Sequence, residues 1–409
     1  MDFDTSRLAA PYLDTAQPRP AGTGGKGRVV VAMSGGVDSS VAALLLAQQG
    51  YEVIGITMRL WTLDRDDLPA PHRTCCSVEA VDDAQRVCQK VGIPWYLMNF
   101  EQPFKAGVVD YFVEEYARGR TPHPCVACNQ HVKFATLLDR ALALGADSLA
   151  TGHYARVAYD GGRYRLLRAV DPAKDQSYVL YGLGQEQLRR VLLPVGHYSK
   201  PDIRRLALDA GLPVADKPDS QEICFIPDND YRRFLSERLA AQPGPIVDRA
   251  GNVLGTHRGI PYYTVGQRQG MGLATGQRLY VLEIDRERNT VVVGPEEGLY
   301  AVGLVAETVT FVSGAAPREP APVTAKIRYK SALVEGTLLP GAGGWEVRFA
   351  EPQRAVTPGQ PVVWYDGDEV LGGGIISAPI RSWDRGEPPR SVVRAGSAAR
   401  PAREGESNR

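Results

Sequence analysis

Residues 29–40 decide the fold of the amino-terminal half of the chain, and they read Val29-Val30-Val31-Ala32-Met33-Ser34-Gly35-Gly36-Val37-Asp38-Ser39-Ser40. The apolar run predicts a buried strand, and the paired glycines predict a turn. Val41–Gln49, rich in Ala and Leu, predicts a helix that Gly50 ends. Glycines let the backbone approach an anion closely, and the first turn of a helix has unpaired N–H groups pointing toward it. The stretch therefore predicts a phosphate-binding loop.

Side chains of this loop add to the expected anion site. Ser34, Ser39 and Ser40 bring hydroxyl donors, and Asp38 could hold a magnesium ion that bridges phosphate oxygens. The loop is not a Walker loop, because no Gly-Lys-Ser/Thr closes it, and it lacks the dinucleotide motif Gly-x-Gly-x-x-Gly. It resembles instead the pyrophosphate loop of the ATP pyrophosphatases, which split ATP into AMP and pyrophosphate to activate an oxygen for replacement. An ordinary Gly-Gly turn before a buried helix is the alternative interpretation.

Strands and helices alternate along the residues that follow. The pattern predicts strands at Tyr51–Met58, Trp95–Phe100 and Ser148–Thr151, and helices at Val78–Val91, 102–118, 131–144 and 201–210, with Ser199 as N-cap of the last. Such alternation is typical of a doubly wound parallel sheet, in which ligands bind at the carboxyl ends of the strands. We therefore expect an α/β nucleotide-binding domain.

The pattern changes at about residue 243 to short β segments separated by turn residues. Beyond residue 300, four segments alternate like strands, and they are Val323–Tyr329, Gly336–Leu339, Trp345–Phe349 and Pro361–Tyr365. They predict a small β-barrel. We divide the chain into a flexible leader (1–27), an ATP-pyrophosphatase catalytic domain (28–225), a small central domain (226–299), a barrel (300–384) and a disordered tail (385–409).

Composition sets limits on the class of protein. A length of 409 residues predicts two or three domains, and 44% apolar with 23% charged residues is typical of a soluble globular protein. No apolar run is long enough to cross a membrane. Six cysteines without a secretory signal indicate a cytoplasmic location, where cysteines do chemistry. Lys plus Arg and Asp plus Glu are both 47, so net charge gives no hint of a nucleic-acid partner.

A Cys-x-x-Cys pair, Cys125 and Cys128, follows two prolines in the loop 120–130. The prolines predict an extended backbone, and Lys133 with the coming helix would favour a thiolate. A zinc site would need a second such pair, and the chain has none, so we expect no zinc. The remaining cysteines are Cys75, Cys76, Cys88 and Cys224; we interpret Cys88, and with less basis Cys75 and Cys76, as packing residues.

Further motifs occur together and in order with the loop. They are Thr121-Pro122-x-Pro124-x-x-x-Cys128-Asn129, Ala150-Thr151-Gly152-His153-Tyr154, Lys174-Asp175-Gln176-Ser177-Tyr178, Asp219-Ser220-x-x-Ile223-Cys224-Phe225, Gly259 through Gly270, Ala355–Gln360 and Leu371–Ile376. Together they resemble the tRNA-specific 2-thiouridylases, which place sulfur at C2 of the wobble uridine in certain tRNAs. The match runs from about residue 28 to 380.

This resemblance implies a reaction and its residues. The ATP site would comprise Ala32, Met33, Ser34, Gly35, Gly36, Val37, Asp38, Ser39, Met58 and Gly152, with Mg²⁺ at Asp38. ATP would adenylate the uridine O2. A sulfur carrier protein would deliver a persulfide to Cys224, and that sulfur would displace AMP with the assistance of Cys128, the cycle including a disulfide bond. The residues implied to contact tRNA are His123, Pro124, Cys125, Lys174, Asp175, Gln176, Arg328 and Tyr329. We expect a monomer.

One basic stripe is ambiguous. Lys326, Arg328 and Lys330 alternate on one face of the predicted strand, with Tyr329 opposite, which suits tRNA contact. A solvated strand face would give the same pattern.

Cys125 departs from the family pattern, which has Asp at this position, proposed to assist proton transfer near the target base. A thiol could take over that role, or Cys125 could be a passive variant. Alternatively, Cys125, Cys128 and Cys224 could hold an iron–sulfur cluster with one iron left open to bind sulfide. Two rival functions remain: another ATP-pyrophosphatase ligase, which would need no Cys128–Cys224 pair, and a non-catalytic RNA-binding module, which would need no phosphate loop.

Overall fold

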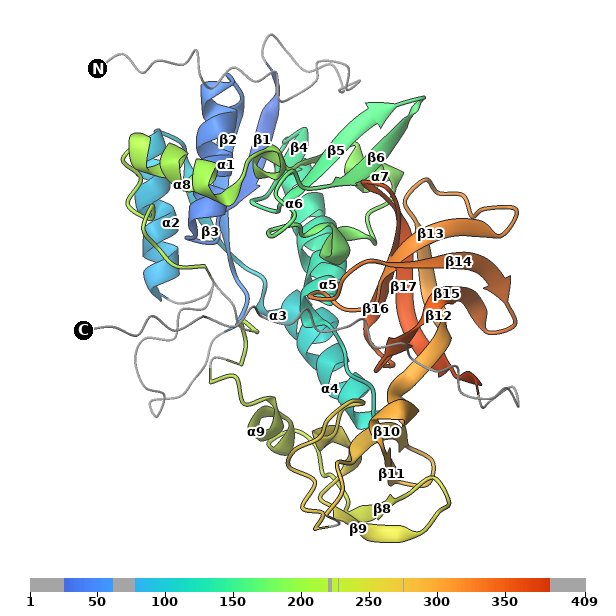
Figure 1. Ribbon diagram of the computed structural model, residues 1–409. Helices are drawn as coiled ribbons and strands as arrows, with labels where there is room; N and C mark the ends of the chain where they lie inside the picture. Colours follow the sequence, from blue (N-terminus) through green and yellow to red (C-terminus); the bar gives the residue numbers. More distant parts are fainter. Residues whose placement is uncertain (1–25, 62–77, 220–222, 227, 275, 383–409) are drawn as a thin grey trace, which may run out of the picture.

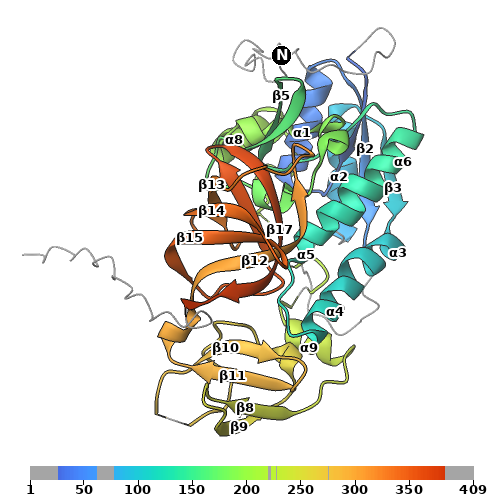
Figure 2. The ribbon, with the colours of Figure 1, turned by 90° about the vertical axis from the view of Figure 1, so that its right-hand side faces the viewer.

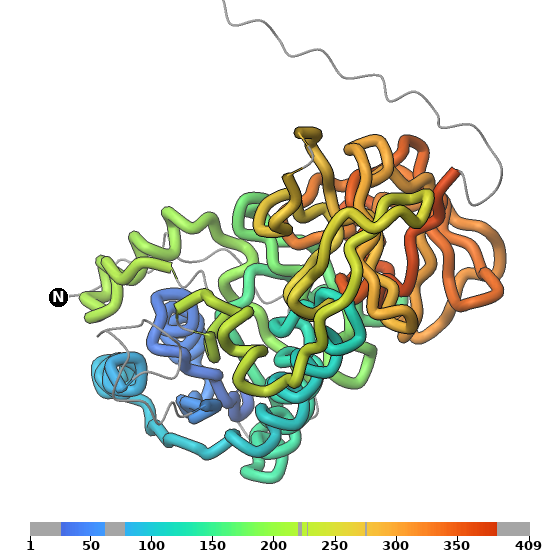
Figure 3. The backbone as a smooth tube through the Cα atoms, turned by 90° about the horizontal axis from the view of Figure 1, so that it is seen from below, coloured from blue at the N-terminus to red at the C-terminus, as the bar shows by residue number. Residues whose placement is uncertain are grey.

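The computed structural model describes residues 26–61, 78–219, 223–226, 228–274 and 276–382. Seen from below, the blue amino-terminal segments and the red carboxyl-terminal strands lie on opposite sides of the molecule, with cyan and green segments between them (Figure 3). The predicted leader, apart from Lys26 and Gly27, and the predicted tail lie outside the described residues. So do Cys75 and Cys76.

A five-stranded parallel sheet forms the centre of the amino-terminal part (Figure 1). The sequence predicts the parallel sheet and four of its strands, and it misses the short strand β7. Its strands are β1 (Arg28–Ala32), β2 (Glu52–Arg59), β3 (Trp95–Asn99), β4 (Ser148–Ala150) and β7 (Val191–Leu192), in the order β3-β2-β1-β4-β7. The three valines of β1 are buried, as expected for a central strand of a parallel sheet covered on both faces. The strand order reverses between β1 and β4, and in such sheets ligands bind at this point.

Three helices pack around this sheet: α1 (Val37–Gln48), α2 (Val78–Val91) and α8 (Lys200–Asp209). α1 begins four residues before the predicted start. The predicted start lies too far along the chain because Asp and Ser are weak helix formers inside a helix, although they are well suited to its first turn. α2 has the predicted bounds. The predicted N-cap of α8 is confirmed, since the Ser199 hydroxyl accepts a hydrogen bond of 3.3 Å from the Asp202 N–H.

Two further helices contain π-helical stretches. The first runs through α3 (Glu101–Phe104), η2 (Lys105–Asp110) and α4 (Tyr111–Ala117), and the second through α5 (Pro124–Ala127), η3 (Cys128–Leu137) and α6 (Leu138–Ala143). The second helix begins at Pro124 and not at residue 131 as predicted. A proline favours extended backbone before it but is also well suited to the first helical position. Cys125 and Cys128 therefore lie about one turn apart on a helix, not in an extended loop.

The predicted barrel is confirmed and closed (Figure 2). Its strands are β12 (Tyr300–Phe311), β13 (Ala321–Lys326), β14 (Val334–Gly341), β15 (Gly344–Arg354), β16 (Pro361–Asp366) and β17 (Glu369–Ile380). β12 pairs with both β15 and β17, which completes a ring of six antiparallel strands.

Strand β13 ends three residues before its predicted end. The Ser331 hydroxyl donates to the Arg328 carbonyl oxygen over 2.9 Å, and the Ser331 N–H donates to the same oxygen over 3.0 Å. These bonds form a turn. The predicted alternation of Lys326, Arg328 and Lys330 on one strand face is therefore wrong.

A hairpin that the sequence analysis missed links the parallel-sheet part to the barrel. It consists of β5 (Ala155–Asp160) and β6 (Arg163–Arg168), and Glu369 of β17 pairs in register with Leu167 of β6. The Glu369 carboxylate also accepts hydrogen bonds from the Arg165 guanidinium at 2.8 Å. The hairpin thus extends the sheet of the barrel.

The described residues of the central part form a four-stranded sheet, a short α-helix and short 3-10 turns, and they lie at the opposite end of the molecule from α1 and β1 (Figure 1). The helix and the strands are α9 (Tyr231–Ser236), β8 (Gly244–Val247), β9 (Val253–His257), β10 (Tyr280–Asp285) and β11 (Thr290–Gly294). α7 (Gln185–Leu188) lies earlier, beside β6 and β7.

The largest apolar core is shared between the two ends of the chain. Phe104 and Phe112 of the helical part belong to the same buried cluster as Val363, Tyr365 and Val370 of the barrel. The barrel therefore packs as part of the main core.

Candidate active site

The phosphate loop connects β1 to α1 and is held by its own serines. The Ser34 N–H donates to the Ser39 hydroxyl over 3.2 Å, and the Ser39 and Ser40 hydroxyls both reach the Gly36 carbonyl oxygen, at 3.2 and 2.8 Å. Ser39 and Ser40 are buried, whereas Ser34 is exposed. Of the three predicted hydroxyl donors, two therefore fix the shape of the loop and Ser34 faces the solvent.

The two loop glycines differ in backbone conformation and in their neighbours. Gly35 has φ +67°, and a Cβ there would overlap the Ala80 backbone of α2, lying 2.8 Å from its carbonyl carbon. Gly36 has an ordinary extended backbone (φ −98°, ψ 164°), and its nearest neighbour would be the Ser34 hydroxyl oxygen at 3.4 Å. Packing thus requires glycine at Gly35. At Gly36 no packing contact requires glycine, and the absence of a side chain leaves open space at the start of α1.

Gly152 follows β4 and closes the other side of the loop. A Cβ on Gly152 would lie 2.6 Å from the Ser39 backbone nitrogen and 2.7 Å from the Asp38 carbonyl carbon. Met58 lies on the other side of β1, near the carboxyl end of β2. The expected nucleotide residues therefore gather around the carboxyl ends of β1, β2 and β4, at the switch point of the sheet.

Asp38 is the charged side chain of this loop, and it is already partnered. Its Oδ1 accepts hydrogen bonds from the Tyr154 hydroxyl and from the Lys200 ammonium, both over 2.7 Å. Burial, and next the Asp38 carboxylate, raise the pKa of Tyr154 well above its ordinary value, so Tyr154 stays a donor. The sequence analysis did not identify Lys200. Its position beside a helix N-cap gave no signal.

Lys200 joins Asp38 to a second carboxylate, Asp219. The Lys200 ammonium lies 2.9 Å from Asp219, which also accepts from Lys174 over 2.8 Å and from Arg204 over 2.9 Å. Burial alone would raise the pKa of Asp219, but hydrogen bonds from Lys174 and Lys200 outweigh it and lower that pKa to about 2. Asp219 therefore stays ionised and keeps these cations beside the phosphate loop.

A second lysine, Lys217, also contacts the loop. The Lys217 ammonium donates to the Gly35 carbonyl oxygen over 3.0 Å and pairs with Asp83 over 2.7 Å. The loop itself contains no cation, and Lys200 and Lys217 bring ammonium groups into hydrogen-bond contact with it. Cations in such a place attract phosphate groups. The arrangement fits ATP as a ligand.

The segment before the cysteine helix is clamped by the barrel. The Thr121 N–H donates to the Pro358 carbonyl oxygen over 2.9 Å, and the Gln360 side-chain amide donates to the Thr121 carbonyl oxygen over 2.8 Å. A Cβ on Gly359 would lie 2.8 Å from the Thr121 nitrogen. The motif Ala355–Gln360, which had no predicted role, thus fixes where the helix with Cys125 and Cys128 begins.

The cysteines differ in exposure. Cys125 is exposed, Cys224 is half-buried and Cys128 is 7% exposed. Cys88 is buried in α2, and burial raises its pKa to about 12, which supports its interpretation as a packing residue. Within the described residues, no three His, Cys, Asp or Glu side chains form a group that could hold a metal ion. In this conformation, Cys125, Cys128 and Cys224 therefore do not form a ready set of cluster ligands.

Three aromatic rings and one ammonium group lie together near Cys125. The rings belong to His123, Tyr178 and Tyr329, and the ammonium group belongs to Lys326. The His123 ring lies 5.9 Å from the Tyr178 ring and 6.0 Å from the Tyr329 ring, between centroids. The Lys326 ammonium lies 5.7 Å from the Tyr329 ring centroid. Burial lowers the pKa of His123 to about 4, so the imidazole is neutral, and its Nδ1 is buried with no hydrogen-bond partner within the described part.

The predicted segment 174–176 is engaged within the protein. Lys174 pairs with Asp219, and the Gln176 side-chain oxygen accepts from the Tyr154 N–H over 2.9 Å. Asp175 is buried and accepts from the Ser177 hydroxyl over 2.9 Å. The predicted residue Arg328 is half-buried and donates to the Arg354 carbonyl oxygen over 2.9 Å, and Pro124 is buried. These residues lie between the phosphate loop and the barrel rather than on an open basic face.

Comparisons with known proteins agree with this arrangement. Residues 27–228 match a family model described as tRNA methyl transferase HUP domain, residues 232–295 one described as tRNA methyl transferase PRC-barrel domain, and residues 302–376 one described as aminomethyltransferase beta-barrel domain. The tRNA-specific 2-thiouridylase MnmA of Pelotomaculum thermopropionicum is 53% identical over 357 residues, which cover 86% of this chain and 98% of that protein. The protein of the same name from Geobacter metallireducens is 56% identical over 359 residues, which cover 86% of this chain and 97% of that protein.

In the described ranges, no helix has the length and apolar character to cross a membrane.

Proposed function

Because this chain belongs to the tRNA-specific 2-thiouridylase family, we propose that it uses ATP to replace the 2-oxygen of the wobble uridine in tRNA with sulfur. The observation that carries the proposal is the phosphate loop at the β1–β4 switch point, open at Gly36 and flanked by Lys200 and Lys217. The three family models agree in order with the three parts of the fold.

In the first step the uridine O2 attacks the α-phosphorus of ATP. A new O–P bond forms, and the bond to pyrophosphate breaks. Lys200 and Lys217 stabilise the negative charge that moves onto the leaving pyrophosphate. A magnesium ion, held by Asp38, would neutralise further charge on the phosphates. Asp38 Oδ1 already accepts from Lys200 and Tyr154, so the ion would share this carboxylate with them.

In the second step Cys224 carries a persulfide from a sulfur carrier protein. Its terminal sulfur attacks C2 of the activated uridine, a C–S bond forms, and AMP leaves with the original oxygen. Cys128 then attacks the Cys224 sulfur, which breaks the S–S bond to the product and forms a Cys128–Cys224 disulfide. A thiol reductant resets the enzyme. Two cysteines are needed because one carries the sulfur and the other releases it.

The same family assignment extends to the remaining residues and to the setting of the reaction. His123, Pro124 and Cys125 would contact the target base, since they begin the helix that carries Cys128. Lys174, Asp175, Gln176, Arg328 and Tyr329 would contact tRNA or hold the residues that do so. We propose a cytoplasmic monomer.

The experiment that tests the function supplies the purified chain with ATP, a persulfide donor and uridine-containing tRNA. Mass spectrometry of the digested nucleosides should show sulfur in place of oxygen at C2, with pyrophosphate released. This readout also separates thiolation from the methyl transfer that the family-model descriptions name. Cys128→Ala and Cys224→Ala should abolish thiolation, whereas the buried control Cys88→Ala should retain it. A methylated product, or thiolation that survives Cys224→Ala, would refute the proposal.

Cys125 decides between two sulfur chemistries. In the persulfide route, Cys125→Asp restores the residue that the family pattern has, so most activity should persist in protein purified in air. In the alternative route, an iron–sulfur cluster on Cys125, Cys128 and Cys224 would lose a ligand, and carboxylate is the harder, poorer donor. We favour the persulfide route because these cysteines form no ready ligand set in the described structure. Stoichiometric iron in active protein, with an inactive iron-free form, would overturn this choice.

A further inference from the structure

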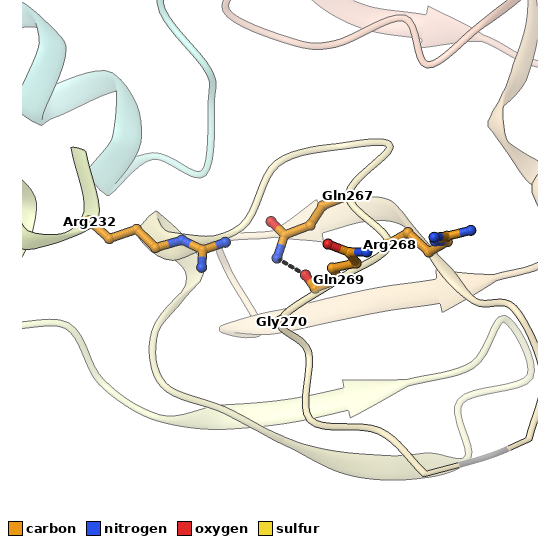
Figure 4. Close-up of a pocket in the computed structure, with 5 residues that line it drawn as sticks. All are labelled: Arg232, Gln267, Arg268, Gln269 and Gly270. Carbon is orange, nitrogen blue, oxygen red and sulfur yellow. Dashed lines mark hydrogen bonds between the residues drawn. The ribbon is translucent and has the colours of Figure 1, made fainter. Parts of the chain in front are cut away.

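An open pocket lies in the central part of the chain (Figure 4), at the opposite end of the molecule from α1 and β1 (Figure 1). The residues that line it are Arg232 of α9 and Gln267, Arg268, Gln269 and Gly270 of the loop before β10. The sequence analysis placed this loop in a family motif, Gly259 through Gly270, but gave it no role. No step of the proposed reaction uses it.

Hydrogen bonds hold this loop in one shape. The Gln267 side-chain oxygen accepts from the Thr264 N–H over 3.2 Å, and its amide donates to the Gln269 carbonyl oxygen over 2.9 Å (Figure 4). The Gln267 carbonyl oxygen accepts from the Val281 N–H of β10 over 2.9 Å. The pocket is therefore largely formed before any ligand binds, which reduces the entropy cost of binding.

Two arginines line this pocket without a carboxylate partner. Arg232 points toward Gln267 and Gly270, and Arg268 extends away from Arg232 on the other side of the loop (Figure 4). Neither Arg232 nor Arg268 forms an ion pair with any carboxylate of the described residues, although the neighbours Arg233 and Arg238 on the same segment pair with Asp228 and Glu237. Arg232 instead contacts the Tyr231 ring, 5.8 Å from its centroid. Both arginines are exposed. Their charge is available to an anion from outside.

Gly270 brings the loop backbone close to Arg232. It has φ +76°, and a Cβ there would lie 3.5 Å from an Arg232 guanidinium nitrogen. A larger side chain would be strained in this conformation and would enter the space in front of the guanidinium. Glycine therefore keeps the pocket open on the side of Arg232.

We propose that this pocket binds a phosphate group of the tRNA backbone. Planar guanidinium groups match phosphate oxygens bidentately, and Gln side chains and backbone N–H groups add neutral donors. The lining includes no apolar anchor, whereas a protein partner docks on a centre of aromatic or aliphatic side chains. A chain with a formal net charge of zero needs such local basic sites to hold RNA. The proposal rests on the proposed function for the identity of the RNA.

The test compares Arg232→Ala, Arg268→Ala and the double variant with the matched control Arg288→Ala. Arg288 lies in the same part of the chain, is 84% exposed, and pairs with Asp285 outside the pocket. Each pocket variant should weaken tRNA binding about 3- to 10-fold and lower the slope of log affinity against log salt by about 1, the double variant by about 2. Arg232→Lys should bind tRNA more tightly than Arg232→Ala but less tightly than the wild type, because lysine keeps the positive charge and lacks the planar guanidinium that can bind a phosphate with two hydrogen bonds.

The readouts separate this proposal from its alternatives. Melting curves of the variants should match the wild type, since both arginines are exposed. At saturating tRNA, pyrophosphate release should be unchanged. Unchanged tRNA affinity and salt slope in the double variant would overturn the proposal. A defect confined to turnover with a protein sulfur donor, absent with sulfide, would instead mark a protein-docking site and also overturn it. If the wild type does not thiolate tRNA, the proposed function fails, but the binding result still decides whether the pocket holds RNA.

Discussion

Two adjacent glycines of the phosphate loop should respond in opposite ways to the same added methyl group. In Gly35→Ala the methyl would overlap the Ala80 backbone of α2, and the residue would have to keep φ +67°. In Gly36→Ala the backbone is already in a region that Ala adopts, and the methyl has only the Ser34 hydroxyl as a neighbour, at 3.4 Å. The first change therefore tests packing, and the second tests space for a ligand.

The structure sets the expected magnitudes. The new Cβ at Gly35 would overlap the Ala80 carbonyl oxygen, its nearest neighbour, and would lie 2.8 Å from the carbonyl carbon, where ordinary contact begins at 3.4 Å. The backbone must therefore move by clearly more than 3.4 − 2.8 = 0.6 Å. Overpacking of this kind costs about 1–3 kcal/mol, and the left-handed backbone adds about 1–2 kcal/mol, for a total of about 2–5 kcal/mol. Gly36→Ala should change the free energy of unfolding by less than about 1 kcal/mol.

Two assays distinguish the roles. Urea denaturation should show a clear loss of stability for Gly35→Ala and almost none for Gly36→Ala. Pyrophosphate release with saturating tRNA should nevertheless fall about 100-fold in Gly36→Ala, because the methyl displaces a phosphate by about 1 Å. Gly343→Ala, where the nearest atom would be at 3.6 Å in the barrel, is the control for an added methyl. Wild-type pyrophosphate release by Gly36→Ala, or wild-type stability of Gly35→Ala, would refute the reasoning.

Three further predictions concern charges and sulfur. Lys200→Met should lower pyrophosphate release about 100-fold, because it removes a cation from beside the leaving phosphates. The control Lys105→Met removes an exposed lysine that pairs with Asp110 and should leave the rate unchanged. Equal rates of pyrophosphate release in the two variants would exclude Lys200 from the phosphate site. Cys224→Ser should still release pyrophosphate with tRNA and make no 2-thiouridine, and loss of both activities would assign Cys224 to activation instead. Because the folded pKa of Asp219 lies at about 2, below its ordinary 3.8, the stability it contributes is present above about pH 4 and is lost as the pH falls toward 2. Asp219→Asn should therefore reduce the difference between urea midpoints at about pH 5 and pH 3, and an unchanged difference would contradict the ion-pair account.

Local patterns predicted the parallel sheet, the barrel and the position of the phosphate loop, because each depends on residues close together in sequence. The β5–β6 hairpin also had a local signal, Gly161-Gly162 between alternating residues, and it was overlooked. The early start of the helix at Pro124 was missed for a different reason. Proline is compatible with both an extended loop and a first helical turn, and the choice depends on tertiary contacts.

The contacts of the site could not be predicted from local patterns. Lys200 meets Asp38 across 162 residues, and Gln360 meets Thr121 across 239. Neither residue has a spacing or neighbour that marks its partner. The resemblance placed Asp219 and the motif around Gln360 among important segments, but only the fold shows that one gathers cations and the other clamps a helix.

The core shared between Phe112 and the barrel residues Val363, Tyr365 and Val370 has a consequence for synthesis on the ribosome. The chain emerges amino-terminal end first, so the parallel sheet and its helices are complete long before β16 and β17 exist. Until those strands arrive, apolar side chains that they will cover stay accessible to chaperones and to other nascent chains. A stop codon before about residue 360 should therefore give an aggregating fragment rather than a separate ATP-binding domain. We therefore expect the amino-terminal part to reach its full stability only when the last strands have been made.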